Sequence, residues 1–187
     1  EKLFIAANNI KGKQNISFSV VRYGNVMGSR GSVIPLFLKL NKNNKQLTLT
    51  DKVMTRFNIT LKESIELVLS SLKNSREGEI FIPKIPSFYI LDLIKAIAPN
   101  KKFKLIGVRP GEKIHEELIS VYEGKSAVEF KNYYAILPTI DQNIIKSYCL
   151  KKKCKTVAPN FLYTSANNKN FLKVSEIKKL LDVNFRD

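Results

Sequence analysis

The residues best suited to chemistry lie in one glycine-bearing run, Arg22-Tyr-Gly-Asn-Val-Met-Gly-Ser-Arg-Gly31. Apolar residues 18–22 lead into this run and apolar residues 33–40 follow it, which predicts a strand, a turn and a helix. Glycines let a backbone approach a ligand closely, and the free N–H groups of a helix start point toward an anion. The run therefore fits a phosphate-binding turn, although a purely structural turn remains an alternative.

The spacing of the glycines argues against the two commonest phosphate loops. Gly24, Gly28 and Gly31 match neither the dinucleotide fingerprint GxGxxG nor the Walker loop GxxxxGK[ST]. The turn is therefore predicted to be neither the NAD(P) loop nor an ATP site.

Three arginines strengthen the phosphate hypothesis. Arg30 lies in the turn, and Arg56 and Arg109 are each expected at a strand end. A guanidinium group matches two phosphate oxygens at a time. Glu112 could accept hydrogen bonds from ribose hydroxyls, but it could equally pair with Arg109, and a surface ion pair is the alternative for each arginine.

The composition fits a globular protein. The chain has 187 residues, 44% of them hydrophobic, enough for one domain with a core or one domain plus a lobe. It contains neither an apolar run of the ~20 residues that span a membrane nor a secretory signal. It begins at Glu1 within a helical pattern, so we expect a fragment that lacks its N-terminal part.

Charge and cysteine content limit the other classes of function. The net charge of +16 is compatible with a polyanionic partner, but scattered lysines also suit a soluble surface. Cys149 and Cys154 have neither zinc nor CxxC spacing, and His115 is the only histidine, so no metal site is predicted. For His115 we expect a structural or surface role. Two cysteines make no disulfide framework, which favours a reducing cytoplasm.

Strand and helix patterns alternate through residue 108, which predicts an α/β fold. Thr60 and Glu63 form a capping-box pattern before one helix, and Ser87 and Ser175 are expected to cap two others. Residues 128–130 and 133–137 are expected to form paired strands, and residues 141–165 are expected to be mostly irregular.

Four segments in order carry a family resemblance: FSVVRYGNVMGSRGSVIPLF, TDKVMTRFNIT, GEIFIPKIPS and IGVRPGEKIHE. Together with Tyr133-Tyr-Ala-Ile-Leu-Pro138, they resemble the inverting UDP-N-acetylglucosamine 4,6-dehydratases over nearly the whole chain. These bacterial enzymes belong to the extended short-chain dehydrogenase/reductase (SDR) superfamily. The resemblance implies the C-terminal part of an NAD(P)-binding Rossmann-type extended SDR fold plus a substrate lobe. It assigns residues 1–30 to the end of the Rossmann-type domain, 31–120 to the lobe and 121–187 to a small appendage.

The same resemblance implies a reaction. Bound NADP accepts a hydride from C4 of the sugar, water is lost across C5 and C6, and the hydride returns to C6 with inversion at C5. The product is a UDP-4-keto-6-deoxy amino sugar for surface glycans or flagellar sugars such as pseudaminic acid. In the family the Tyr-x-x-x-Lys pair and the GxxGxxG loop come before the position of Glu1. We therefore expect no catalytic residue in this chain, no activity from it alone, and a homo-oligomer in the cytoplasm for the full-length enzyme.

Matching positions supply the expected site. Asn25 is implied beside the reacting sugar, and Val26 at the nicotinamide end of the cofactor. Asn58 stands where an aromatic residue is expected in many relatives. The remaining substrate residues implied are Arg30, Gly31, Ser32, Val33 and Ile34 around the UDP-sugar, Arg56 and Arg109 toward the diphosphate, and Glu112 toward the uridine ribose.

Two other functions remain open. One is a UDP-sugar epimerase of the same superfamily. The other is a nucleic-acid-binding module, since residues 142–175 contain lysines and aromatic residues but no acidic residue. The same stretch contains no arginine and no known RNA-binding motif, so the sequence favours the enzyme.

Overall fold

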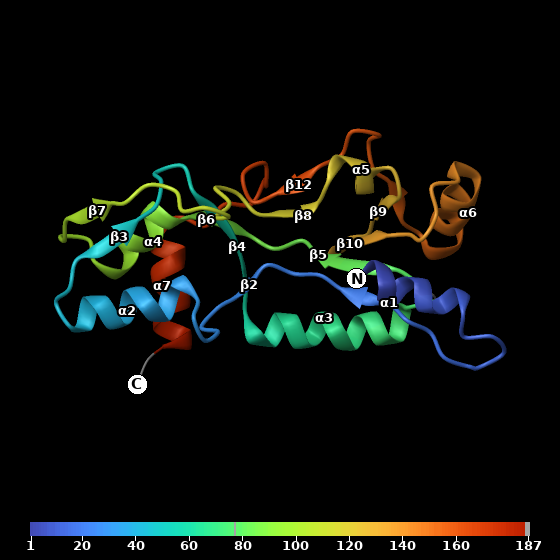
Figure 1. Ribbon diagram of the computed structural model, residues 1–187, viewed down its shortest axis with the longest axis horizontal. Coiled ribbons are helices and arrows are strands. Elements are labelled where there is room, and N and C mark those ends of the chain that lie inside the picture. Colours follow the sequence, from blue (N-terminus) through green and yellow to red (C-terminus); the bar gives the residue numbers. More distant parts are fainter. Residues whose placement is uncertain (77, 186–187) are drawn as a thin grey trace. The chain divides into compact units, whose positions relative to one another are not determined.

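The computed structural model describes residues 1–76 and 78–185, and its mixed α/β architecture confirms the predicted fold class (Figure 1). The chain forms two compact units, and each unit is assembled from three separate segments. Unit 1 contains Glu1–Tyr23, Lys62–Lys84 and Glu117–Tyr163, and unit 2 contains Gly24–Leu61, Ile85–Glu116 and the residues from Thr164 on.

Unit 1 is built on a five-stranded sheet with the order β1-β5-β10-β9-β11. The pair β1 and β5 is parallel, whereas the other neighbours run antiparallel. The predicted pairing of residues 128–130 with 133–137 is confirmed by β9 and β10. The strands are β1 (Val20–Val21), β5 (Ile80–Pro83), β9 (Ala127–Glu129), β10 (Tyr133–Ile136) and β11 (Lys155–Thr156).

The helical elements associated with unit 1 are α1 (Lys2–Ala6), the 3₁₀ turn η1 (Ala7–Asn9), α3 (Leu61–Asn74), α5 (Val121–Gly124) and α6 (Gln142–Lys152). Helix α3 begins directly after Thr60, as the capping pattern predicted. Phe81, Val128 and Ala135 of the sheet pack with Ile145 and Cys149 of α6 in one buried cluster. Because this core draws on β5, β9, β10 and α6, segments far apart in sequence stabilise one another.

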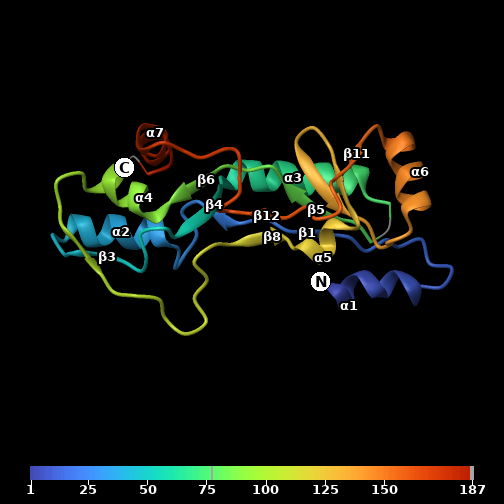
Figure 2. The same ribbon diagram turned by 90° about the horizontal axis from the view of Figure 1, so that it is seen from above.

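The prediction that residues 141–165 are mostly irregular was wrong. Helix α6 occupies eleven of these residues and lies beside β11 (Figure 2). The Asp141 carboxylate caps it by accepting hydrogen bonds from the backbone N of Asn143 at 2.8 Å and of Ile144 at 3.4 Å. Only Ile145 and Cys149 of this helix are buried, so its apolar periodicity is too weak to be recognised from sequence.

Unit 2 contains two small sheets. In the order β2-β4-β6, β4 runs parallel to β2 and antiparallel to β6, while β3 and β7 form a separate parallel pair. Strand β8 (Glu117–Ile119) belongs to unit 1, and β12 (Tyr163–Thr164), which pairs with it, ends at the first residue of the last segment of unit 2. The strands of unit 2 are β2 (Asn25–Val26), β3 (Leu47–Leu49), β4 (Thr55–Ile59), β6 (Ser87–Tyr89) and β7 (Phe103–Leu105).

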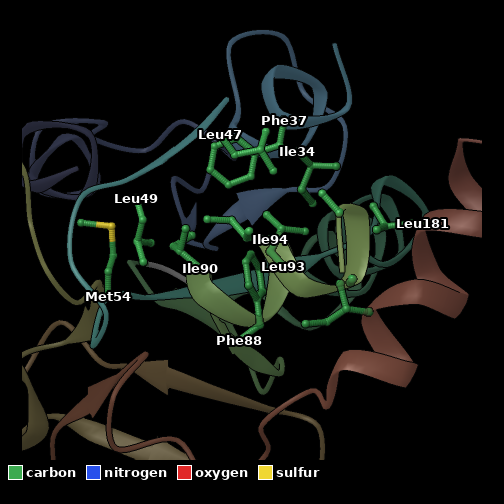
Figure 3. Packing of buried hydrophobic residues seen from close by; sticks show 13 residues of the cluster. Ile34, Phe37, Leu47, Leu49, Met54, Phe88, Ile90, Leu93, Ile94 and Leu181 are labelled. Atoms are coloured by element: carbon green, nitrogen blue, oxygen red, sulfur yellow. The ribbon is translucent and has the colours of Figure 1, made fainter. Parts of the chain in front are cut away.

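The core of unit 2 lies around helix α4 (Ile90–Ile97), whose residues Leu93 and Ile94 are almost completely buried. Figure 3 shows these side chains between Phe37 of helix α2 (Val33–Lys42), Leu49 of β3 and Leu181 of helix α7 (Val174–Asn184). This apolar packing fixes the start of α2 relative to β3 and β4, the elements that surround the candidate site.

Two predicted helix caps were wrong. Ser87 lies in β6, where its N–H donates to Asn170 O at 2.8 Å, and α4 begins only at Ile90. Ser175 lies inside α7, which begins at Val174. In the first case a strand-like pairing with a distant segment outweighs the local capping preference of serine.

Candidate functional site

A cavity of about 430 Å³ in unit 2 lies among the turn after β2, the start of α2, strands β3 and β4, and the loop after β7. The structure brings most of the predicted site residues together around it. Those lining the cavity are Asn25, Arg30, Gly31, Ser32, Val33, Arg56, Arg109 and Glu112. Two others do not line it: Ile34 is 4% exposed and belongs to the hydrophobic core, and Val26 is half-buried in β2.

The glycine turn has the backbone that its sequence predicted. Gly31 adopts a φ of +77°, a conformation that side chains other than glycine rarely accept. A side chain at Gly24 would place its Cβ 2.5 Å from Phe57 Cβ, so the turn approaches β4 closely only because this residue is glycine. The turn can therefore bring the start of α2 to the edge of the cavity.

Ser32 precedes helix α2 as predicted, with an extended backbone. Its hydroxyl makes no hydrogen bond to the N–H groups of the helix. Ser32 Oγ is buried and has no hydrogen-bond partner in the described residues 1–76 and 78–185. A buried hydroxyl at a helix start, next to free N–H groups, is available to a ligand that carries negative charge.

Arg56 is the second residue of β4, close to the strand start, and its side chain is 14% exposed. Its Nη1 donates to the backbone oxygens of Thr55 at 2.7 Å and Ile114 at 3.0 Å. Its Nε lies 3.7 Å from Glu116 Oε1. These contacts fix the guanidinium plane, and among the described residues they leave Nη2 without a protein acceptor.

Glu116 joins the segment before β8 to strand β4. Its Oε2 accepts a hydrogen bond from Phe57 N at 3.0 Å. Burial raises the pKa of Glu116, and the hydrogen bond from Phe57 and the charge of Arg56 offset this only in part. The Glu116 carboxylate therefore lies beside Arg56 at ion-pair distance, 3.7 Å from Nε, and does not contact Nη2.

Arg109 and Glu112 occupy a turn in the loop after β7. Arg109 does not lie at a strand end, because β7 ends at Leu105, and its side chain is 70% exposed. Glu112 Oε1 accepts from Thr50 Oγ1 at 3.2 Å, and Glu112 Oε2 lies 3.9 Å from Arg109 Nε. This long ion pair leaves the Arg109 guanidinium accessible, while Thr50 helps to hold the Glu112 carboxylate.

Sequence reasoning did not single out Thr48 and Thr50 of the β3 region, which also line the cavity. Their spacing of two residues places both side chains on one face of an extended segment. That polar face was the available signal, since the intervening Leu49 points into the core.

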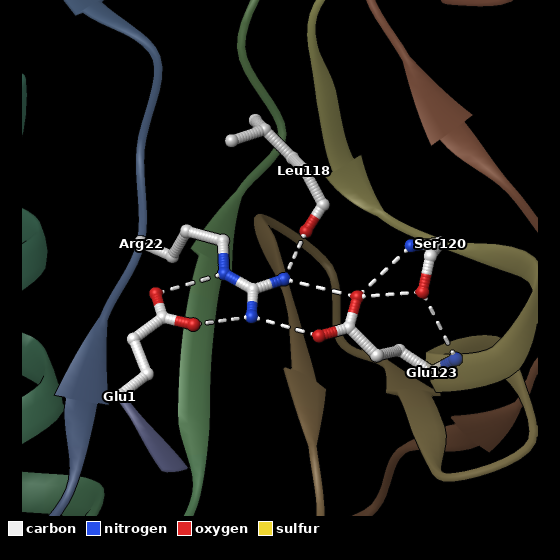
Figure 4. A network of polar contacts seen from close by, with 5 residues as sticks. All are labelled: Glu1, Arg22, Leu118, Ser120 and Glu123. Atoms are coloured by element: carbon white, nitrogen blue, oxygen red, sulfur yellow. Dashed lines mark hydrogen bonds and ion pairs between the residues drawn. The ribbon is translucent and has the colours of Figure 1, made fainter. Parts of the chain in front are cut away.

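Arg22 opens the same sequence run but is not part of this cavity. It lies in unit 1, where Nε and Nη2 contact the Glu1 carboxylate, Nη2 also donates to Glu123 Oε1 at 2.8 Å, and Nη1 donates to Leu118 O at 2.7 Å (Figure 4). Although burial opposes ionisation, hydrogen bonds from Arg22 and Ser120 lower the pKa of Glu123 to about 2. The cluster is a structural ion-pair network.

The other candidate groups make contacts that do not suggest a metal centre. His115 Nδ1 lies 2.8 Å from Thr55 Oγ1. Cys149 and Cys154 are free thiols with sulfur atoms 3.3 Å apart. No cluster of three or more His, Cys, Asp or Glu residues suited to a metal occurs within residues 1–76 and 78–185. Across those same residues no helix is both long and apolar enough to cross a membrane.

Comparisons with known proteins show the family and the fold to which the chain is similar. A family model described as polysaccharide biosynthesis protein matches residues 1–138. The chain is 46% identical to a UDP-N-acetylglucosamine 4,6-dehydratase (inverting) of Campylobacter jejuni, covering 97% of this chain and 56% of that protein. It is 41% identical to a UDP-glucose 4-epimerase of Rickettsia bellii, covering 97% and 54%.

Among solved structures, the chain is similar to the X-ray structure of Pen from Bacillus thuringiensis, with a TM-score of 0.81 and 34% identity. The similarity covers 96% of this chain and 53% of that one. The chain thus spans about half the length of the relatives that it matches. The comparisons therefore show its fold and family, and they do not show the activity of a complete enzyme.

Proposed function

Because the chain belongs to the polysaccharide biosynthesis protein family, we propose that it supplies the UDP-sugar site of a UDP-N-acetylglucosamine 4,6-dehydratase of the inverting type. One observation carries the proposal: Arg30, Arg56 and Arg109, far apart in sequence, line the same cavity of about 430 Å³. A diphosphate is the part of such a substrate that arginine forks recognise best.

The residues around the cavity suggest how the substrate is held. Arg56 through Nη2 and Arg109 through its exposed guanidinium bind the diphosphate, together with the Ser32 hydroxyl at the start of α2. Glu112, held by Thr50, accepts hydrogen bonds from the uridine ribose. Asn25 contacts the sugar. These groups orient the substrate, and the proposed chemistry depends on residues outside this chain.

The proposed cofactor is NADP. Bound to the full-length enzyme, its nicotinamide would supply reversible hydride transfer to and from the sugar. The described residues do not provide a complete cofactor site, since their glycine spacing does not match a dinucleotide loop. Val26, at the end of β2, is the residue of this chain proposed to meet the nicotinamide.

The remaining expectations complete the proposal. Residues 1–30 belong to the end of a Rossmann-type domain, residues 31–120 to a substrate lobe and residues 121–187 to an appendage. The full-length enzyme is a cytoplasmic homo-oligomer, and this chain alone is inactive. A nucleic-acid-binding role gains no support from the family membership.

The test is turnover by the full-length protein loaded with NADP. With UDP-N-acetylglucosamine we expect a product that has lost one water and carries a ketone at C4, detected by mass spectrometry and NMR. No turnover of any UDP-hexose would show that the dehydratase assignment is wrong.

The alternative activity is UDP-sugar epimerisation, which the 41% identity to a UDP-glucose 4-epimerase supports. The identities of 46% and 48% to two dehydratases favour the first assignment. If the full-length protein instead forms a C4 or C2 epimer that keeps its 6-hydroxyl group, the epimerase assignment would be favoured over the dehydratase assignment.

A further inference from the structure

A buried polar cluster lies behind Arg56 in unit 2, and the sequence singled out only His115 among its members, with a structural or surface role. It consists of Thr55 in β4, His115 and Glu116 before β8, and Ser165 after β12. Ser165 is 0% exposed and Thr55 is 1% exposed. Buried polar groups are expensive unless they are hydrogen-bonded, so the partners of these hydroxyls determine what the cluster does.

The hydroxyls form one connected chain. His115 Nδ1 lies 2.8 Å from Thr55 Oγ1, which lies 2.7 Å from Ser165 Oγ. Ser165 Oγ in turn donates to Thr55 O at 3.2 Å and accepts from Glu116 N at 2.9 Å. Each hydroxyl has one proton, so when Ser165 donates to Thr55 O, Thr55 is the donor to Ser165 and a protonated His115 Nδ1 is the donor to Thr55.

Ser165 is also tied down through its backbone, because Ser165 N donates to Glu116 O at 2.8 Å. It therefore bonds Glu116 twice and Thr55 twice, although it lies 110 residues from Thr55. A small side chain with this many short bonds holds two backbone segments at a fixed separation.

The same two segments hold the guanidinium of Arg56. Its two backbone acceptors, Thr55 O and Ile114 O, belong to them, and Thr55 N donates to Ile114 O at 3.1 Å. The Thr55 oxygen is shared between Ser165 Oγ and Arg56 Nη1. Movement of Ser165 would therefore act directly on the Thr55 oxygen, and on the Ile114 oxygen through Glu116 in the same segment.

We propose that Ser165, through Thr55 and Glu116, is a positioning residue that fixes the Arg56 guanidinium so that Nη2 is free to bind a phosphate of a nucleoside diphosphate. The identity of that ligand rests on the proposed function, whereas the fixing of Arg56 does not. An arginine that is already ordered loses less conformational freedom on binding, so its contact with an anion is stronger.

The primary test observes Arg56 directly in the full-length protein labelled with ¹⁵N-arginine. Its Nε–H signal is assigned by its disappearance in Arg56→Lys, and rotation of the guanidinium is measured by NMR exchange. In Ser165→Ala we expect this rotation to be roughly 10-fold faster. The reason is that the Thr55 oxygen, which accepts from Arg56 Nη1, loses its hydrogen bond from Ser165 Oγ. Unchanged slow rotation in the folded variant would overturn the proposal.

A matched control is Ser71→Ala. Ser71 is also buried, and its Oγ donates to Leu67 O at 2.7 Å within helix α3 of unit 1. This substitution removes a buried hydroxyl from the other unit, so we expect the rotation of Arg56 to be unchanged. If the rotation of the Arg56 guanidinium becomes faster by the same factor in Ser165→Ala and Ser71→Ala, the cause is a general loss of stability, which would contradict a positioning role for Ser165.

If Ser165→Ala does not fold, the Thr55 pair provides the same test. Thr55→Val keeps the shape of the side chain but removes the hydroxyl that links His115 to Ser165, whereas Thr55→Ser keeps the hydroxyl. We expect fast Arg56 rotation in Thr55→Val and slow rotation in Thr55→Ser. Equal rotation in the two variants would overturn the proposal.

The affinity for UDP separates this inference from the proposed function. We expect UDP binding to Ser165→Ala to be about 5- to 10-fold weaker than to wild type, with KM raised and kcat within about 2-fold. Wild-type protein that binds no UDP, while Ser165→Ala still frees Arg56, would overturn the proposed ligand but not the positioning. Wild-type protein that binds UDP, with unchanged affinity and unchanged Arg56 rotation in Ser165→Ala, would overturn the positioning alone.

Discussion

Two arginines in the two units have opposite surroundings. Arg22 in unit 1 directs its guanidinium nitrogens at the carboxylates of Glu1 and Glu123 and at the oxygen of Leu118. Arg56 in unit 2 directs Nη1 at two backbone oxygens, keeps the Glu116 carboxylate at 3.7 Å, and leaves Nη2 without a protein acceptor among the described residues. Both are largely buried, so burial alone does not distinguish them.

The pKa values of the carboxylates beside these arginines are shifted in opposite directions. The pKa of Glu123 falls to about 2 because hydrogen bonds from Arg22 and Ser120 outweigh its burial. The pKa of Glu116 rises because burial outweighs the more distant Arg56. An arginine whose guanidinium nitrogens are all occupied by protein groups stabilises the fold, while an arginine that keeps one nitrogen without a protein acceptor at a cavity retains the capacity to bind an anion.

The largest effect is expected from breaking the structural side of the comparison. Arg22→Met leaves the partly exposed carboxylates of Glu1 and Glu123 without a cation and should lower the free energy of unfolding by about 2–3 kcal/mol, less than a fully buried pair would, measured by urea denaturation. UDP affinity should be unchanged. Lys95→Met is the control, because its pair with Asp92 is 53% exposed on the lysine side and should contribute less than about 1 kcal/mol. If Arg22→Met lowers the free energy of unfolding by less than about 1 kcal/mol, the structural role of Arg22 is contradicted.

Arg109→Ala tests the binding side. Loss of its phosphate contact should weaken UDP-sugar binding by about 1.5–3 kcal/mol with little change in NADP occupancy, measured by titration calorimetry on the full-length protein. Lys104→Ala removes an exposed cation from the neighbouring strand β7 and should leave the affinity unchanged. Equal affinities in wild type and Arg109→Ala would refute the assigned contact.

Arg56→Lys sharpens the comparison, since it keeps the charge and removes the fork. A lysine cannot hold two backbone oxygens and a phosphate in one plane, so UDP affinity should fall by about 1–1.5 kcal/mol. The free energy of unfolding of Arg56→Lys, measured in urea, should differ less from that of the wild type than the value for Arg22→Met does. Wild-type affinity in Arg56→Lys would indicate that charge alone matters at this position.

The smallest effects are expected in the dependence of stability on pH. Glu123 has a folded pKa below its ordinary 4.5, so its contribution is present above pH 4.5 and lost as the pH falls toward 2. Glu116 has a raised pKa, so its contribution to stability is present below pH 4.5 and is lost as the pH rises above 4.5 through its folded pKa.

Unfolding free energies measured across this range should separate the two carboxylates. Glu123→Gln should lack the loss of stability at low pH, and Glu116→Gln should lack the decline above pH 4.5. The same pH profile in both variants would show that the two sites do not differ as the structure indicates.

Local patterns predicted much of the fold and part of the site. The turn between the strand and the helix of residues 20–42 follows from Gly28 and Gly31, whose positive φ other residues rarely accept, and the helix from the apolar pattern after it. Helix α6 was missed because only Ile145 and Cys149 are buried, and Ser87 was misassigned because its backbone pairs with Asn170. In both cases distant partners, invisible in a local window, decided the structure.

The sequence by itself determined which residue types could bind a UDP-sugar: a glycine turn, three arginines and a carboxylate. Only the tertiary structure decided what each arginine does. Arg22 begins the same run as Arg30, yet Glu123, 101 residues away, occupies its guanidinium. Ser165 lies 110 residues from Thr55 and organises Arg56. Hydrogen bonds depend on distance and direction in space, so whether an arginine remains free for a ligand is decided by the folded chain.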